Sequence, residues 1–468
     1  MSVRIDDGPE LTSPIVRPRS LRMIAVYLAL VVVPVALIWF TLRHGLSATG
    51  RPAGGPATPS VPDVFPRLLI AIPVILAACH LCGRLFRRLA QPPVIGEIIA
   101  GVLLGPSVLG ALWPAGYATL FPPGLVSTLS TLSQVGLIFF MFLVGYELDL
   151  DLVRQRSYTA AVISHVSIVV PFLCGVLLAL ALYPVLGSGG VGQLAFTLFF
   201  GISMSITAFP VLARILSDRG MSRTPVGVMS LTCAAVDDVT AWCVLAAVVA
   251  VTRSAAADVA LVTAGMSVGF FAVMAFGVRP LLRRLLGPGG LLPEAAVLPV
   301  ALAGLMLSAL ATDAIGIHSI FGAFLFGAIM PRGSLPVRRA AGQLHGLTVT
   351  LLLPLFFVYT GLHTEFGLLG ADGRLWAWCL LITAVAVLAK AGGSTTAARV
   401  SGIGWRDSLS LGVLMNCRGL TELVVLNIGM SMGVISPTVF TMLVFMTLVS
   451  TVMTAPCLDL LRRLRRDS

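Results

Sequence analysis

Long apolar runs of about twenty residues fill the sequence, and short segments with arginine, glycine or proline separate them. A run of this length lets an α-helix cross the hydrocarbon core of a bilayer. The pattern predicts fourteen spans, near 23–42, 66–86, 93–112, 125–147, 158–185, 192–216, 224–251, 257–282, 293–312, 317–331, 346–362, 375–398, 407–430 and 437–460. The chain is therefore predicted to be an all-α polytopic membrane protein with short loops.

The composition agrees with this prediction and argues against a soluble protein. Of 468 residues, 57% are hydrophobic and only 11% are charged, whereas soluble proteins carry about 25% charged residues. The eight cysteines lie in or at the ends of apolar runs, which predicts buried thiols rather than disulfides. No P-loop, HExxH motif or nucleophile elbow occurs, so neither an enzyme nor a cofactor is expected.

The basic residues predict the orientation of the chain. With both termini inside, 24 of the 31 basic residues lie on the cytoplasmic side and 5 outside, while Lys390 and Arg418 fall within spans. This asymmetry follows the positive-inside rule, so the net charge of +11 does not imply binding to nucleic acid. The predicted segments are a cytoplasmic N-terminus 1–22, an additional transmembrane helix 23–42, a Pro/Gly-rich linker 43–65, the transmembrane domain 66–461 and a basic cytoplasmic tail 462–468. The expected location is the cell membrane.

Three pairs of segments resemble each other at nearly constant separation. They are GEIIAGVLLG from Gly96 with HSIFGAFLFG from His318, FFMFLVGYE from Phe139 with LFFVYTGLH from Leu355, and GISMSITAF from Gly201 with GVLMNCRGL from Gly412. In the predicted topology, the two copies of each pair begin on opposite sides of the membrane. The pattern predicts an inverted repeat, the architecture in which an ion site lies near the midplane at the repeat interface.

Charged residues inside spans are costly and are functional candidates by default. The six candidates are Glu97, Asp237, Asp238, Lys390, Arg418 and Glu422. Two adjacent acids at the centre of one span predict a carboxylate site for a proton or a monovalent cation, because helix pairing alone needs only one acid. Lys390 is the only lysine, and an ammonium can release its proton whereas a guanidinium cannot, which suits a coupling role.

Two interrupted helices at corresponding positions of the two halves predict the place of the site. In 192–216, Pro210 predicts a break near residues 207–210, with hydroxyl oxygens from Ser203, Ser205 and Thr207 beside it. The corresponding segment holds Asn416, Arg418, Gly419 and Glu422. The spacing of Arg418 and Glu422 predicts a supporting ion pair within one helix.

The remaining polar candidates are weaker. Glu97 lies near the cytoplasmic end of its span, as either an access-funnel carboxylate or a helix-terminus partner. His165, His318 and His363 occur singly and are expected to be packing residues. The candidate ligands are hard oxygens, which favour monovalent cations over a transition-metal site.

Four ordered motifs carry a family resemblance: PPVIGEIIAGVLLGPSVLG, SITAFPVLARILSDRG, AAVDDVTAW and MNCRGLTELVVLNIG. From about Leu68 to Leu461 the chain resembles the monovalent cation:proton antiporter-2 family, which includes plant cation/proton exchangers and bacterial sodium/proton and potassium/proton antiporters. The resemblance implies thirteen core helices, a dimerisation part, a core part with two crossed broken helices and elevator-like alternating access. The helix at 23–42 is then an addition.

The resemblance also assigns residues. Asp238 matches the ion-binding aspartate, and Asp237 matches the neighbouring position, which is Asp in electrogenic members and often Asn in others. Lys390 matches the lysine that pairs with the first acid, and Thr207 matches the polar residue of the first broken helix. No nucleotide-binding domain follows Leu461, so regulation by NAD or glutathione is not expected.

The predicted function is secondary antiport of Na+ and/or K+ against protons by alternating access, with Asp237 and Asp238 as the shared site. If Lys390 and a carboxylate both release protons when the cation binds, exchange is electrogenic at two protons per cation. Proton-coupled export of an organic or ionophore-bound cation, and a gated cation channel, stay open as alternatives. The expected partners are Na+ or K+, protons, the lipid bilayer and a second copy of the chain as a homodimer.

Overall fold

The computed structural model describes residues 64–89, 91–147, 158–187, 192–253, 257–370 and 373–466. The chain divides into two units, Met1–Pro73 and Val74–Ser468. In the first unit, the described residues are the beginning of helix α3 (Val64–Arg88). The predicted segments 1–22 and 23–42, and all but the last two residues of 43–65, lie outside the described residues. The second unit carries the site.

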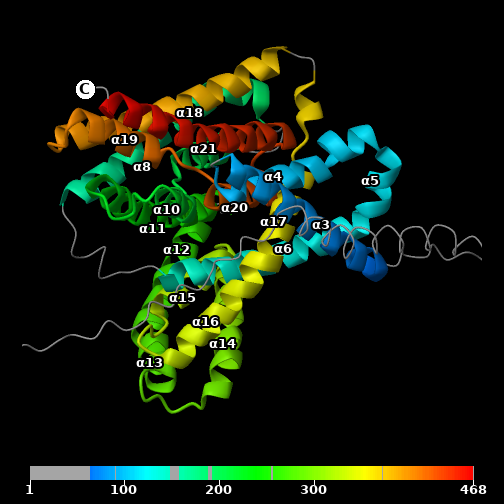
Figure 1. Cartoon of the computed structure of the whole chain (residues 1–468). Helices are drawn as coiled ribbons and strands as arrows, with labels where there is room; N and C mark the ends of the chain where they lie inside the picture. The colour runs from blue at the N-terminus through cyan, green and yellow to red at the C-terminus, as the bar shows by residue number, and fades with distance from the viewer. Residues whose placement is uncertain are drawn as a thin grey trace, which may run out of the picture. The chain divides into compact units, whose positions relative to one another are not determined.

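Every regular element among the described residues is a helix (Figure 1). After α3 come α4 (Pro93–Leu104), η2 (Pro106–Gly110), α5 (Pro114–Leu120), α6 (Pro123–Glu147), α8 (Tyr158–Leu186), α9 (Gln193–Ser205), α10 (Phe209–Asp218), α11 (Pro225–Arg253), α12 (Ala257–Ala272), η3 (Val273–Val278), α13 (Arg279–Leu286), α14 (Glu294–Ile315), α15 (Ser319–Ile329), α16 (Leu335–Leu347), η4 (Thr348–Leu352), α17 (Leu353–Leu362), η5 (Phe366–Leu369), α18 (Gly373–Val400), α19 (Trp405–Met415), α20 (Leu420–Ser431) and α21 (Pro437–Arg466).

Eleven helices in the described ranges are long and apolar enough to cross a membrane, and α19 with α20 forms a twelfth span if the bent pair counts as one. The predicted all-α polytopic architecture is thus confirmed for this part of the chain. The predicted span 317–331 corresponds to α15, which has 11 residues, fewer than the roughly 20 that a full crossing needs. The number of thirteen core spans therefore stays a prediction.

Three helices continue past the apolar runs that predicted them. The helix predicted to end at 282 extends through α13 to Leu286, and α17 is preceded without interruption by α16, which begins at Leu335. Residues up to Arg466, predicted to belong to a separate basic tail, continue α21. The apolar run marks only the part that fits the hydrocarbon core, and arginine is a good helix former that lets a helix extend beyond it.

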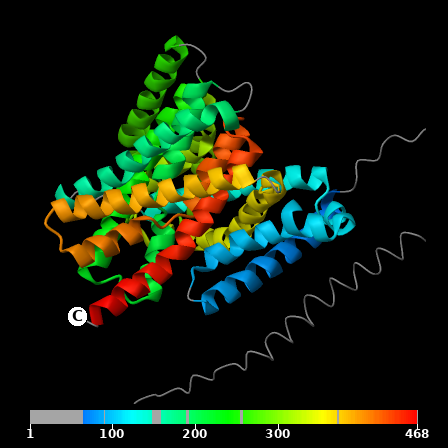
Figure 2. The same cartoon turned by 90° about the horizontal axis from the view of Figure 1, so that it is seen from above.

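Within the second unit, two groups of helices can be distinguished by the helices that they contact. α8 packs against α9, α11 and α18, and α18 in turn packs against α19 and α21 (Figures 1 and 2). α12, α13, α14 and α16 form what we call the α14 lobe, in which α14 packs on α12, α16 and the neighbouring α15. α15 also packs on α6, while α17 packs on α4 and α6. The first group carries the candidate site.

The contacts of α4 with α17 and of α6 with α15 involve glycines at matching positions of the predicted repeat. A Cβ added at Gly105 would lie 2.6 Å from the carbonyl oxygen of Gly361, and one added at Gly327 would lie 2.1 Å from that of Phe142. Only glycine allows these backbones to approach so closely. The matched contacts favour the inverted repeat, which stays a prediction.

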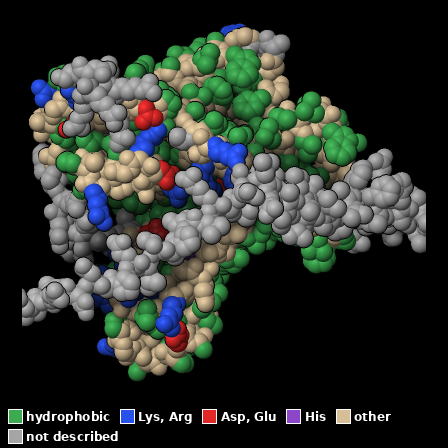
Figure 3. Space-filling view, viewed as in Figure 1, with side chains coloured by type: hydrophobic (Ala, Val, Ile, Leu, Met, Phe, Trp, Pro, Cys, Tyr) green, Lys and Arg blue, Asp and Glu red, His purple; other side chains and the backbone are tan. Residues whose placement is uncertain are grey.

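Large apolar side chains are exposed over much of the surface (Figure 3). Examples are Phe276, Leu112 and Leu388. Apolar exposure on this scale is unfavourable in water and favourable against lipid tails.

Candidate ion-binding site

The first helix break separates α9 from α10. α9 ends at Ser205, residues 206–208 are extended, and α10 begins at Phe209. Pro210 therefore lies in the first turn of α10, where a missing backbone N–H leaves no hydrogen bond unmade. The break lies one to two residues earlier than the predicted 207–210, because Pro210 begins the second helix rather than interrupting the first.

The second break, residues 416–419, separates α19 from α20, and the two helices are bent by 42°. The two breaks touch each other. The backbone N–H of Ala208 donates to the carbonyl oxygen of Cys417 at 3.0 Å, and the hydroxyl of Thr207 lies 3.2 Å from the carbonyl oxygen of Met415. Each break thus satisfies backbone groups that the other leaves free, as irregular backbone in a membrane interior requires.

Asp237 lies on α11 beside this crossing, is fully buried and is surrounded by donors. The hydroxyl of Ser164 donates to its Oδ1 at 2.5 Å. Its Oδ2 accepts from the hydroxyls of Ser167 at 2.6 Å and Thr207 at 2.9 Å, and from Lys390 Nζ at 3.2 Å. Helices α8 and α18 and the first break therefore all converge on one carboxylate.

Asp238, the next residue, has a different environment. It is 4% exposed, and its Oδ1 has no hydrogen-bond partner among the described residues. The backbone of Phe209, at the N-terminal end of α10, lies within hydrogen-bonding range of its carboxyl group. The positive end of a helix favours an anion there. Asp238 is thus an acid beside the break, and one of its two carboxylate oxygens can accept a further ligand.

The C-terminal end of α9 is capped by two buried cations. Lys390 Nζ donates to the carbonyl oxygen of Ser205, as well as to that of Ser167 at 2.8 Å. The guanidinium of Arg418 donates to the carbonyl oxygens of Ser203 at 2.9 Å and Met204 at 2.6 Å. Because a helix leaves its last carbonyl groups without intrahelical partners, these cations complement both the free acceptors and the negative end of the helix dipole.

Arg418 also pairs with Glu422 at 3.1 Å, and both side chains are fully buried. The backbone at Arg418 is held by Thr451, whose hydroxyl accepts from its N–H at 3.1 Å and donates to its carbonyl oxygen at 2.8 Å. The second break is therefore fixed by an ion pair within its own chain segment and by α21.

Several residues that the sequence predicts for the site either contribute to it through other atoms than expected or lie away from the two acids. The hydroxyls of Ser203 and Ser205 donate back to carbonyl oxygens within α9, so these residues present carbonyl rather than hydroxyl oxygens to the cations. Asn416 is buried in the second break, and its Oδ1 has no hydrogen-bond partner in the part of the chain that the structure describes. A Cβ at Gly419 would lie 2.8 Å from Val211 Cγ2. Glu97 lies on α4 beside Gly83 of α3, without a hydrogen bond to Asp237 or Asp238 among the described residues.

Three further residues of the site are not predicted from the sequence: Ser164, Ser167 and Thr451. Ser164 and Ser167 are spaced i, i+3 on α8, so both hydroxyls face the same side of the helix. This spacing within an apolar span is the one feature of the sequence that could have indicated a role for the two serines in the site. It is weak, because serines in membrane helices commonly bond to their own backbone.

Comparison with known proteins decides the family. Residues 74–460 match the sequence profile of the family described as sodium/hydrogen exchanger, transmembrane. The chain belongs to this family. It is therefore a multi-pass membrane transporter rather than an enzyme, and the predicted family resemblance is confirmed.

Named relatives come from several kingdoms. The Na+/H+ antiporter NhaS4 of Synechocystis sp. is 43% identical over 83% of this chain and 95% of its own length. Cation/H+ antiporter 20 of Arabidopsis thaliana is 37% identical over 84% of this chain and 48% of its own. The K+/H+ antiporter 1 of Saccharomyces cerevisiae is 33% identical over 83% of this chain and 45% of its own length. The chain thus spans about half the length of the plant and yeast relatives.

A solved structure shares the fold. The sodium proton antiporter MjNhaP1 from Methanocaldococcus jannaschii aligns with a TM-score of 0.58 at 14% identity, over 85% of this chain and 98% of its own. At that identity the likeness concerns the fold alone.

Proposed function

We propose that the chain is a secondary antiporter that exchanges Na+ or K+ for protons at Asp237 and Asp238. The observation that carries the proposal is the pair of adjacent buried acids where two broken helices cross. One acid is held by Lys390, and the other has an oxygen without a hydrogen-bond partner among the described residues. The names of the relatives support both cations, since one is a Na+/H+ and another a K+/H+ antiporter.

Competition for the carboxylates accounts for the coupling. In the cation-free state, Lys390 neutralises Asp237 at 3.2 Å. A monovalent cation requires oxygen ligands and negative charge, which Asp238 Oδ1, Asp237 and Thr207 supply together. A cation that binds there neutralises the carboxylates in place of the Lys390 ammonium. A proton then leaves Lys390 or a carboxylate. Cation and protons thereby exclude each other at one place.

Transport requires that the site open to one side at a time. The broken helices and the two acids belong to the helix group around α8 and α18, whereas the α14 lobe is a separate group. We propose that the first group moves against the lobe and carries the site between the two faces of the membrane. The half-helix ends move with the site, so their dipoles remain directed at it.

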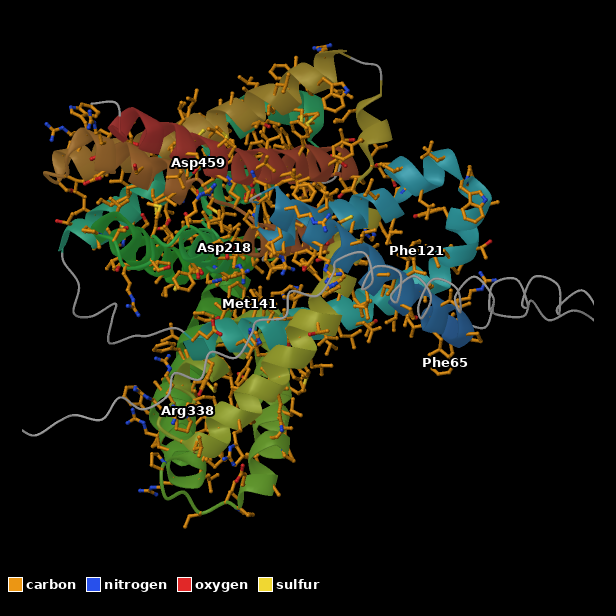
Figure 4. All side chains as sticks on the ribbon, viewed as in Figure 1. Phe65, Phe121, Met141, Asp218, Arg338 and Asp459 are labelled. Atoms are coloured by element: carbon orange, nitrogen blue, oxygen red, sulfur yellow. The ribbon has the colours of Figure 1, made fainter. Side chains whose placement is uncertain are left out.

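Flux in proteoliposomes tests the assignment. Vesicles with an internal pH dye should show proton movement on addition of Na+ or K+ for the wild type, and none for Asp238→Asn. Asp218→Asn is a matched control, because Asp218 lies near the C-terminal end of α10 and pairs only with the exposed Arg214 among the described residues (Figure 4). Cation-dependent proton movement by Asp238→Asn at the wild-type rate would remove Asp238 from the mechanism. A current whose reversal potential does not depend on the pH gradient would instead indicate a channel.

Lys390→Arg tests the number of protons exchanged. Arginine keeps the charge but does not release a proton at physiological pH. We expect charge movement per cation to fall if Lys390 carries one of two protons, as measured by transport current against isotope flux. An active variant with unchanged charge per cation would assign both protons to the carboxylates.

A further inference from the structure

A cavity of about 380 Å³ is lined by residues of α13 and of the turn that joins α15 to α16. α13 belongs to the α14 lobe, as Figure 1 shows. Arg279 and Arg283 line it from α13, and Arg332 lines it from the turn. None of the described residues that line it is acidic. Its size falls within the range of small-ligand pockets, about 300–1,000 Å³.

The sequence of α13 places two of its three arginines on one side. Arg279 and Arg283 are spaced i, i+4 and share a helix face, while Leu282 and Leu286 of the same helix are buried. Within the described ranges, neither Arg279 nor Arg283 forms an ion pair. On the same lobe, Arg339 does pair with a carboxylate, that of Glu294, at 2.6 Å. Acid partners are therefore available on this lobe, but neither Arg279 nor Arg283 is paired with one among the described residues.

The turn opposite α13 completes the cavity. A Cβ at Gly333 would lie 3.3 Å from Pro288 Cγ, so this turn touches the turn that follows α13. α16 begins at Leu335 and is 13 residues long, which directs the positive end of its dipole toward the same turn. Three guanidinium groups and a helix N-terminus around one cavity favour a ligand with at least one full negative charge. Phosphate oxygens match the planar, forked donors of arginine.

The surface beside the cavity indicates what else the ligand carries. Phe276 is 83% exposed and Val273 is 60% exposed, and both lie in η3, which leads directly into α13. An exposed apolar strip thus continues along the helix from the arginine pair. Inorganic phosphate or a nucleotide would leave this strip uncovered, whereas the acyl chain of a lipid would cover it. In the proposed orientation, these arginines lie at the cytoplasmic leaflet, where anionic lipids gather.

We propose that this cavity binds the phosphate group of an anionic phospholipid, with Arg279, Arg283 and Arg332 around the headgroup and an acyl chain along Phe276 and Val273. The site is separate from the carboxylate pair, so the proposal does not depend on the transport function proposed above. A bound lipid would join α13 to the α15–α16 turn and so stabilise the α14 lobe.

The test is lipid binding to the full chain in detergent, measured by native mass spectrometry and by thermal stabilisation. The probes are phosphatidylglycerol, phosphatidylcholine, inorganic phosphate and ATP. Arg283→Gln should lower the affinity for phosphatidylglycerol by about tenfold or more, because a hydrogen bond to a charged group is lost. Arg284→Gln is the matched control, since Arg284 is the next residue on the same exposed helix and does not line the cavity. Phosphatidylcholine should bind the wild type more weakly than phosphatidylglycerol.

A second variant tests the apolar strip. Phe276→Ser leaves all three arginines in place and should weaken the binding of phosphatidylglycerol. The proposal is overturned if Arg283→Gln and Arg284→Gln lose affinity equally, because the attraction is then general surface charge. It is also overturned if phosphate or ATP stabilises the protein and phosphatidylglycerol does not, or if no probe binds.

Discussion

The break between α9 and α10 and the break between α19 and α20 occupy corresponding places in the predicted inverted repeat, yet the charged residues around them are arranged differently. At the first break, the acids belong to α11 and their cation, Lys390, belongs to α18. At the second, Arg418 lies in the break itself and its acid, Glu422, lies one turn later in the same segment. Both ion pairs are fully buried and nearly equal in length, at 3.2 and 3.1 Å.

The difference concerns which pair a helix movement can open. Arg418 and Glu422 are four residues apart in one continuous chain segment, so a movement of the neighbouring helices carries both together. Asp237 and Lys390 belong to different helices, so a small shift of α11 against α18 separates them. In addition, a lysine can lose its proton when its partner leaves, whereas an arginine stays charged. The comparison assigns exchange to the first break and permanent support to the second.

The largest effect is expected from removal of the permanent pair. Arg418→Gln leaves Glu422 without its cation and the carbonyl groups of Ser203 and Met204 without their donors. Breaking a buried pair costs about 3 to 5 kcal/mol, so the free energy of unfolding, measured by SDS titration in mixed micelles, should fall by that amount. Arg214→Gln removes another i, i+4 pair, with Asp218, that is about half exposed. It should cost under about 1 kcal/mol.

Equal losses in the two arginine variants would contradict the idea that burial, rather than spacing, makes the Arg418 pair important. Cation-dependent proton movement provides a second check. A partly folded Arg418→Gln population should retain the wild-type number of protons per cation, because Arg418 supports the site without binding the cation.

The next effect separates the two neighbouring acids. Asp237→Asn removes the partner of Lys390 and should lower the free energy of unfolding by about 2 kcal/mol, less than the loss of Arg418 because the lysine can deprotonate. Asp238→Asn removes a like charge beside Asp237 and should leave that free energy unchanged or raise it. The measurement is SDS unfolding near neutral pH without Na+ or K+. If Asp238→Asn is the less stable of the two, the roles of the acids are reversed.

Sequence alone predicts the features that depend on one segment at a time. Apolar run length predicts the spans, a pair of acids in mid-span predicts the carboxylates, and Pro210 predicts a break within two residues of its position. Contacts between segments that are distant in the sequence cannot be predicted in this way. That Arg418 reaches the carbonyl groups of α9 depends on how the two breaks cross, and no local pattern encodes it.

The smallest effect concerns the two serines of α8, which bond different oxygens of Asp237. The hydroxyl of Ser164 is the sole donor to Oδ1 among the described residues, at 2.5 Å, whereas Oδ2 retains Thr207 and Lys390 if Ser167 is removed. Ser164→Ala should therefore cost about 1 to 2 kcal/mol of unfolding free energy. Ser167→Ala should cost under about 1 kcal/mol, because its oxygen stays satisfied.

The same two variants also probe how firmly the exchange site is held. An acid that loses one neutral donor keeps its charge and its lysine, so both variants should retain coupled exchange, with a lower apparent cation affinity in Ser164→Ala. Apparent affinity is measured from the Na+ or K+ dependence of the pH-dye signal in proteoliposomes. A larger loss of stability in Ser167→Ala would show that Oδ2 depends on the serine rather than on Lys390. The pair at the first break would then be held by neutral hydrogen bonds, and its contrast with the arginine pair would disappear.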